Sequence, residues 1–334
     1  MSQSFDRERH IRYFSHCLRQ LPDAYITLDT NRLTLVHFCV HALDLLNALE
    51  EECQVVVNQQ QVIDWIYSLQ VQGGFCGGTF CCGREQQHGY THSHIAMTYT
   101  ALATLVALGD HELSHVDKDS ILLSLKQLQC PNGSFQAVVG IGSSEHDMRF
   151  LYCACAISYM LQDWTGVDQE KAVSYIKSCK SYDGAIALLP GQEGHGGSTF
   201  CGVASLVLMG RLDEMEKDFS KDLVQWCVSR QVNGMQGRPN KAEDTCYSYW
   251  IGGTLRLLGH QELLDEEKLC HYVMTCQTQM GGFGKVVGAF PDVLHSFYSM
   301  AWLSLSTQAN ELKALNCTLG ICQERAAFFE GNVP

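Results

Sequence analysis

The sequence lacks a long apolar run, an excess of positive charge and a regular cysteine framework. No segment offers the roughly 20 consecutive apolar residues that a membrane-spanning helix requires, and residues 1–20 are too polar and charged for a signal peptide. The chain has 36 acidic and 23 basic residues, and its formal net charge of −13 argues against a nucleic-acid-binding surface. We therefore expect a protein with no membrane span and no nucleic-acid partner.

The 17 cysteines are scattered through apolar segments instead of being spaced as a disulfide framework. This usage is typical of a reducing compartment where thiols fill space in the core, so we expect a cytoplasmic protein without disulfides. With 334 residues, 46% of them hydrophobic, the chain can bury a sizeable core. We expect a single domain over residues 1–334, with its core at about 9–305 and short polar termini.

Glycine-centred turns recur along the chain at nearly regular spacing. Their key glycines are 59, 51, 50 and 48 residues apart, namely Gly74, Gly133, Gly184, Gly234 and Gly282. A period near 50 residues fits a repeat of two helices.

Helical periodicity surrounds each turn. An amphipathic run such as 62–69 precedes the turn, and a more apolar helix rich in small residues follows it. We expect these second helices at 95–108, 148–161, 200–209, 247–258 and 294–305. With an N-terminal pair around 33–49, about six helix pairs result. Closure into an all-α, α-α barrel (toroid) with inner and outer rings is favoured over an open solenoid.

Two of the inner helices begin with possible metal ligands. One opens with Asp244-Thr245-Cys246, and another opens with Asp292, followed three residues later by His295. Aspartate, cysteine and histidine together can hold zinc with one coordination position free. The alternative is that Asp244 and Asp292 are helix N-caps and that Cys246 is a small buried side chain, and spacing alone leaves both interpretations open.

Cations stand beside these motifs in an otherwise acidic chain. Arg238, Lys241 and Lys285 flank the metal candidates, and the N-termini of the inner helices would add partial positive charge at the mouth of a barrel. This combination indicates a small anionic ligand such as a diphosphate. The alternative is a solvated loop, with His195 as a polar residue before a helix that starts with two glycines.

Several longer motifs match one family in order along residues 9–305. They are residues 29–34 (DTNRLT), 94–100 (HIAMTYT), 147–150 (DMRF), 195–202 (HGGSTFCG), 237–248 (GRPNKAEDTCYS) and 291–295 (PDVLH). The sequence resembles the β subunits of CaaX protein prenyltransferases, and within them those of type I geranylgeranyltransferases. The resemblance implies an α-α barrel that carries the catalytic site of a heterodimer, wrapped by a crescent-shaped helical α subunit that is shared with farnesyltransferase. It also implies transfer of a geranylgeranyl group from geranylgeranyl diphosphate to proteins whose CaaX box ends in Leu or Phe, such as Rho-, Rac- and Rap-type small GTPases.

The resemblance also assigns roles to individual residues. The implied ligands of one zinc ion are Asp244, Cys246 and His295, with the substrate cysteine in the fourth position, and Lys285 completes the catalytic set in place of a magnesium ion, which should not be required. The implied diphosphate site is His195, Arg238, Lys241 and Tyr247, and the lipid channel is lined by Thr34, Phe38, Tyr99, Arg149, Tyr152 and Trp250. The implied peptide pocket is Thr34, His94, Ala96, Phe150 and Leu294.

Other interpretations share part of this pattern. A farnesyltransferase β subunit is disfavoured by Thr34, where that enzyme carries tryptophan, and by Lys285, where it carries a carboxylate. Matches to the CaaX-type pocket disfavour a Rab-type subunit, and an aspartate-rich proton-donor motif of a terpene cyclase is missing. A helical-repeat binding scaffold without chemistry remains a separate class. The segment 77–90 is shorter than the family loop, which leaves peptide specificity open. We interpret Cys81 and Cys82 as incidental, with a second metal site as the alternative.

Overall fold

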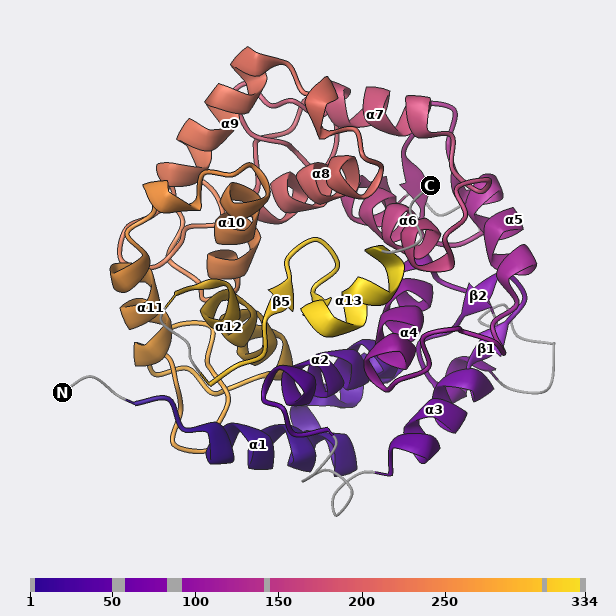
Figure 1. Cartoon of the computed structure of the whole chain (residues 1–334), viewed down its shortest axis with the longest axis horizontal. Coiled ribbons are helices and arrows are strands. Elements are labelled where there is room, and N and C mark those ends of the chain that lie inside the picture. Colours follow the sequence, from indigo (N-terminus) through magenta and orange to yellow (C-terminus); the bar gives the residue numbers. More distant parts are fainter. Residues whose placement is uncertain (1–3, 50–57, 83–91, 141–144, 308–310, 331–334) are drawn as a thin grey trace.

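The computed structural model describes residues 4–49, 58–82, 92–140, 145–307 and 311–330. In these residues an inner ring of helices is surrounded by an outer ring (Figure 1). The inner helices are α2 (Arg32–Leu45), α4 (Ile95–Ala107), α6 (Met148–Leu161), α8 (Gly196–Leu208), α10 (Cys246–Leu257) and α12 (Val293–Leu305). Each packs against the next in this order and α12 packs against α2, which closes the ring. The predicted α-α barrel is confirmed.

The outer helices alternate with the inner ones along the chain. They are α1 (Arg7–Arg19), α3 (Gln59–Ser68), α5 (Lys118–Leu128), α7 (Gln169–Ser178), α9 (Lys217–Val228) and α11 (Glu266–Thr275). The sequence predicts the inner helices to within two residues at most ends. One exception is α8, which begins at Gly196 instead of residue 200, because the His195 side chain accepts a hydrogen bond from the Gly197 amide and caps the helix. The other is the N-terminal pair predicted around 33–49, because that range holds only α2, which ends at Leu45, and its outer partner is α1.

Small residues let the inner helices pack closely. A Cβ atom added at Gly252 of α10 would lie 2.3 Å from the Trp302 ring of α12, far inside van der Waals contact. The small side chains of the inner ring therefore follow from its geometry, because larger ones would force neighbouring helices apart.

The glycine turns join successive repeats of the outer ring. A Cβ atom at Gly133 would lie 2.0 Å from the Lys171 carbonyl oxygen of α7, and the left-handed φ of +91° at Gly133 also favours glycine. At the last turn, a Cβ atom at Gly281 would lie 2.2 Å from the Arg9 carbonyl oxygen of α1. The final turn thus packs on the first outer helix and closes the outer ring.

A glutamine before the turn makes the same link in four repeats. Its side-chain oxygen accepts a hydrogen bond from the backbone N–H of the aspartate that begins the next outer helix, in the pairs Gln70–Asp117, Gln129–Asp168, Gln231–Asp265 and Gln277–Asp6. The last pair spans 271 residues. A repeated sequence feature therefore closes the barrel.

Short β-pairings, which the sequence does not predict, brace some of these turns. Strand β1 (Gln70–Val71) pairs with β2 (Gly74–Phe75), and β3 (Phe135–Gln136) pairs with β4 (His146–Asp147), both antiparallel.

The C-terminal segment lies inside the ring (Figure 1). Strands β5 (Leu315–Asn316) and β6 (Ile321–Cys322) form a hairpin that leads into α13 (Gln323–Glu330). Leu319, Ile321 and Phe329 are at most 1% exposed. The sequence predicts a core that ends near residue 305 and a polar C-terminus, and that prediction is wrong, because these apolar side chains fill the barrel.

Thirteen of the described cysteines are free thiols, but Cys76 is disulfide-bonded. The expectation of a chain without disulfides is therefore wrong at Cys76, whose partner lies outside the described side chains. Among the described residues, no helix combines the length and apolarity needed to cross a membrane.

Candidate metal centre and anion site

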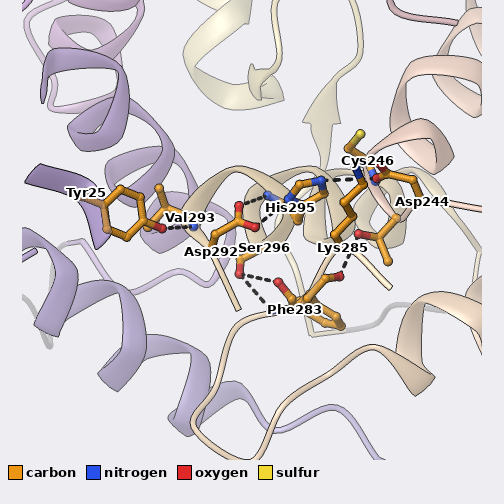
Figure 2. A network of polar contacts seen from close by, with 11 residues as sticks. Tyr25, Asp244, Cys246, Phe283, Lys285, Asp292, Val293, His295 and Ser296 are labelled. Carbon is orange, nitrogen blue, oxygen red and sulfur yellow. Dashed lines mark hydrogen bonds and ion pairs between the residues drawn. The ribbon is translucent and has the colours of Figure 1, made fainter. Parts of the chain in front are cut away.

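The starts of α10 and α12 bring the three predicted metal ligands together (Figure 2). The ligand atoms of Asp244, Cys246 and His295 all lie within 4.8 Å of one another. The His295 Nε2 atom is 3.3 Å from Asp244 Oδ1. One oxygen, one sulfur and one nitrogen donor form a set that zinc accepts, and three protein ligands leave one position of a four-coordinate zinc ion for another ligand.

Asp292 both caps α12 and orients His295. One carboxylate oxygen accepts a hydrogen bond from the His295 backbone N–H at 2.9 Å, and the other accepts from the imidazole Nδ1–H at 2.6 Å. The N-cap interpretation of Asp292 is therefore correct, but it is incomplete. An imidazole held through Nδ1 presents Nε2 to a metal, which is a common arrangement in metal sites.

The electrostatics of the cluster fit a cation. Burial lowers the pKa of His295, but hydrogen bonds to Asp244 and Asp292 outweigh burial and raise it to about 9. Burial, reinforced by the charge of Asp244, raises the pKa of the Cys246 thiol well above its ordinary value. The thiol therefore stays protonated unless a positive charge is added, and the donor set fits a zinc ion that would supply that charge.

Lys285 is held beside the metal candidates by hydrogen bonds of its own segment. The Thr245 backbone N–H donates to the Lys285 carbonyl oxygen at 3.0 Å, and the Thr245 hydroxyl donates to the Gly284 carbonyl oxygen at 3.0 Å. On the other side, Ser296 of α12 accepts from the Phe283 N–H at 2.8 Å (Figure 2). The ammonium is 3.5 Å from Asp244 Oδ2 while its side chain remains 59% exposed, so it can also reach a ligand.

His195 and Tyr247 form a hydrogen-bonded pair next to the metal candidates. The Gly197 N–H donates to His195 Nδ1 at 3.1 Å, so the proton of a neutral imidazole is on Nε2. Nε2 is 2.9 Å from the Tyr247 hydroxyl oxygen. Burial, followed by the charge of Arg238, lowers the pKa of His195 and keeps it neutral. With Nε2–H as the donor, the Tyr247 hydroxyl proton is free to donate to a ligand.

Two glycines make room for the Tyr247 ring. A Cβ atom at Gly237 would lie 2.2 Å from the ring, and one at Gly196 would lie 3.1 Å from it. Sequence motifs contain both glycines, but their steric role depends on contacts between α8, α10 and the intervening loop.

The predicted cations lie on this side of the barrel with different partners. The charges of Arg238 and Arg149 both act on His195. Arg238 forms an ion pair with Glu193, and Arg149 pairs with Asp147 at 2.6 Å. Within the described residues the exposed Lys241 ammonium has no ion pair, and the Lys241 backbone N–H donates to the Arg238 carbonyl oxygen at 3.4 Å.

Aromatic side chains of the inner helices form a continuous lining. Tyr99 and Tyr152 have ring centroids 5.5 Å apart, and Tyr298 connects Phe38 at 5.6 Å with Trp250 at 4.3 Å. Tyr298 was not predicted, although its position three residues after His295 places it on the same face of α12. Phe200 also joins the lining, between Tyr152 and Trp250.

The predicted peptide-pocket residues lie on four inner helices or at their starts. His94 caps α4, because its Nδ1 atom accepts a hydrogen bond from the Ala96 N–H, and it also packs on the Phe150 ring at 5.8 Å. Thr34 donates a hydrogen bond to the Met97 sulfur at 3.5 Å. Ala96 and Leu294 are partly exposed. Gly77 of the predicted short loop accepts a hydrogen bond from the Leu33 N–H at 2.8 Å, next to Thr34, whereas residues 83–91 of that loop lie outside the described part of the chain.

Comparison with known proteins adds to this geometry. The model of the prenyltransferase alpha-alpha toroid domain matches residues 5–321. This chain belongs to that prenyltransferase family. It is 40% identical to the geranylgeranyl transferase type-1 subunit beta of Arabidopsis thaliana, over 91% of this chain and 86% of that protein. It is 35% identical to the protein of the same name from Dictyostelium discoideum, over 95% of both.

A solved structure of a family member has the same fold. Candida albicans protein geranylgeranyltransferase-I complexed with GGPP matches with a TM-score of 0.87 and 25% identity, over 98% of both chains. The resemblance to type I β subunits that the motifs predict is confirmed. The family match extends past residue 305, in agreement with the buried C-terminal hairpin.

Proposed function

We propose that this prenyltransferase-family chain is the catalytic β subunit of a heterodimeric protein geranylgeranyltransferase type I. It would transfer a geranylgeranyl group from geranylgeranyl diphosphate to the cysteine of cytoplasmic proteins that end in a CaaX box, with Leu or Phe last. Its partners would be a prenyltransferase α subunit and small GTPases of the Rho, Rac and Rap types. The convergence of Asp244, Cys246 and His295 beside the His195–Tyr247 pair carries this proposal.

In the proposed reaction Asp244, Cys246 and His295 would hold zinc, and Asp292 would keep the His295 imidazole oriented for it. A zinc ion held there would supply the positive charge that lowers the pKa of the substrate thiol, so that its sulfur could attack the allylic carbon of the donor at neutral pH. The carbon–oxygen bond to diphosphate breaks as the carbon–sulfur bond forms. The chain's own residues then have to stabilise the departing negative charge.

The leaving diphosphate would be stabilised by donors that are already oriented. The Tyr247 hydroxyl, free to donate because His195 Nε2–H occupies its oxygen, would bind a diphosphate oxygen. Arg238 and Lys241 would add charge from the loop before α10, and Lys285 would take the place of magnesium. The aromatic lining from Phe38 to Trp250 would bind the apolar tail and exclude water.

The test is prenylation by this chain co-expressed with a CaaX prenyltransferase α subunit. Farnesyl and geranylgeranyl diphosphate are offered with peptides ending in Leu or Ser, and zinc is counted in the purified complex. One zinc per heterodimer and preferential geranylgeranyl transfer to the Leu peptide are expected. Farnesyl transfer to the Ser peptide would instead identify a farnesyltransferase, and a folded complex without zinc or transfer would identify a binding scaffold.

A matched pair of cysteine variants assigns the zinc to the site. Cys246→Ala should lose both zinc and transfer. Cys270→Ala changes another free, buried cysteine on outer helix α11 and should retain both. Equal zinc content in the two variants would contradict the ligand assignment.

A further inference from the structure

The C-terminal hairpin inside the barrel ends in a tight, internally bonded turn. The Gly320 N–H donates to the Asn316 carbonyl oxygen at 2.9 Å, and the Leu319 N–H donates to the Asn316 side-chain oxygen at 3.0 Å. Together with the β5–β6 pairing, these bonds give residues 317–320 a defined shape.

Three inner helices hold this turn through tyrosine hydroxyls. Tyr99 of α4 donates to the Leu319 carbonyl oxygen, Tyr152 of α6 to that of Thr318 and Tyr249 of α10 to that of Cys317, each at 2.9 Å. Three consecutive carbonyls are thus satisfied by three separate helices. Buried carbonyls and hydroxyls without partners are costly, so these bonds fix the position of the turn relative to the inner ring.

The turn reaches high into the barrel. The three tyrosines are the fourth or fifth residues of their helices, which places their Cα atoms about 4.5 to 6 Å along the axis from the first helical residue. An inner helix of 13 residues is about 20 Å long. The turn therefore meets the aromatic lining, since Tyr99 and Tyr152 belong to that lining and Tyr249 stacks on Tyr298 at 5.2 Å.

Thr318 has a distinct position at the apex of the turn. Its neighbours Cys317, Leu319 and Gly320 are buried, whereas Thr318 is partly exposed. Ile321, which follows the turn, and Phe329 of α13 are also buried. Thr318 is therefore the residue of the turn 317–320 that keeps accessible surface.

We propose that the turn 317–320, with Thr318 at its apex, is the floor of the isoprenoid channel and limits the length of the donor. This inference rests on the proposed function and adds a residue that selects the substrate. The inner-helix tyrosines hold the floor from the sides. From below, the fully buried Asp44 anchors the hairpin through Lys313 at 3.2 Å and Arg325 at 3.6 Å. A floor held from both directions cannot yield to an extra five-carbon unit without breaking these contacts.

The first test places a larger side chain at the apex of the turn. In the α–β complex, Thr318→Trp should lower the ratio of kcat/KM for the 20-carbon donor to that for the 15-carbon donor by about tenfold or more. The reason is that the end of the longer donor would overlap the tryptophan ring or lose its contacts with the channel, whereas the shorter donor would not. Thr318→Val keeps the volume and removes the hydroxyl, and its ratio should equal that of the wild type. An unchanged ratio in a folded Thr318→Trp complex, or an equal shift in Thr318→Val, would overturn the proposal.

A second variant covers the case in which the tryptophan variant does not fold. Tyr249→Phe removes one of the three bonds to the turn and leaves the ring in place. The loosened floor should raise the kcat/KM ratio of a 25-carbon donor to the 20-carbon donor about threefold or more. A structural defect alone would lower the rates with all donors in proportion, so a folded Tyr249→Phe complex with wild-type ratios would refute the floor.

The outcomes separate this inference from the proposed function. A wild-type complex that transfers neither donor refutes the function and the inference together. A wild-type complex that transfers the 20-carbon donor, with variants that keep its donor ratios, refutes the inference alone.

Discussion

Removing the Asp292 carboxylate should weaken zinc binding without unfolding the barrel. In Asp292→Ala, His295 loses the 2.6 Å hydrogen bond to Nδ1 and α12 loses its cap. Loss of such a partner costs about 10- to 100-fold in metal affinity. The Asp292 side chain is 36% exposed, and solvent screens part of the interaction. We therefore expect the lower end, about tenfold, which corresponds to about 1.4 kcal/mol.

Two further variants separate the cap from the metal partner. Asp292→Asn keeps an N-cap acceptor of similar strength but removes the negative charge, so zinc affinity should fall while the melting temperature of the metal-free complex stays near that of the wild type. Asp265→Ala removes the equivalent cap of outer helix α11. It should cost about 1 kcal/mol of stability and leave zinc affinity unchanged.

The measurement is competition for zinc between the purified complex and a chelator of known affinity, with thermal unfolding of the metal-free samples alongside. Wild-type zinc affinity in Asp292→Ala would refute the role of Asp292 in orienting His295. A loss of affinity in Asp265→Ala equal to that in Asp292→Ala would show that helix capping in general, and not the contact to His295, is responsible.

Four further outcomes are expected. Zinc must displace a proton from His295, whose pKa is about 9, and one from the Cys246 thiol, so affinity should fall as pH falls below about 9, by up to about a hundredfold per pH unit; a flat chelator-competition series from about pH 6.5 to about 8.5 would contradict this. Tyr247→Phe should lower kcat/KM for the donor about 10- to 100-fold through one lost hydrogen bond to a charged group, and wild-type kinetics would exclude the hydroxyl as a donor. Because Lys285 provides a fixed charge, magnesium should change the rate of the zinc-loaded enzyme little, and a large increase would be inconsistent with that role. Thr34→Trp should shift preference toward the 15-carbon donor by about tenfold, and unchanged preference in a folded variant would exclude Thr34 as a length determinant.

Local sequence patterns predict most of the barrel. Helical periodicity gives the inner and outer helices, and the glycine turns mark the repeat. Closure of the barrel also has a sequence signal. Gln129 bonds to Asp168 of the following repeat, and Gln277 of the last repeat makes the same bond to Asp6 at the start of the chain. The prediction succeeds where a contact recurs between neighbouring repeats, since the same residue types then recur in the sequence.

The C-terminal hairpin could not be predicted in the same way. Leu315, Cys317, Leu319 and Ile321 alternate with other residues and are buried, which is a strand pattern, but a two-stranded hairpin is marginal on its own. Its position depends on hydroxyl groups from helices as much as 220 residues away, as in the Tyr99 bond to the Leu319 carbonyl. No local pattern carries that information.

The sequence also predicts one part of the candidate site and not the other. The motifs at the starts of α10 and α12 predict which residues can bind metal, and the structure brings them together. The motifs do not show why Gly237 must be glycine, because the reason is the Tyr247 ring that occupies the space of a Cβ atom. The motifs do not single out Tyr298, because an aromatic residue on an apolar helix is typical of any core; only its spacing of three residues from His295 indicates that it shares the face of the site.

Helix capping explains why the functional groups gather at one end of the barrel. His94, Asp147, His195 and Asp292 each accept a backbone N–H at the start of an inner helix, where unpaired amides require an acceptor. Imidazole and carboxylate have a second polar atom that the cap does not use. In Asp292 that atom orients His295, in His195 it binds the Tyr247 hydroxyl, and in Asp147 it pairs with Arg149. The interaction that begins each of these three helices therefore also positions a group of the site, so a change of cap there perturbs the proposed chemistry even where another acceptor would preserve the fold.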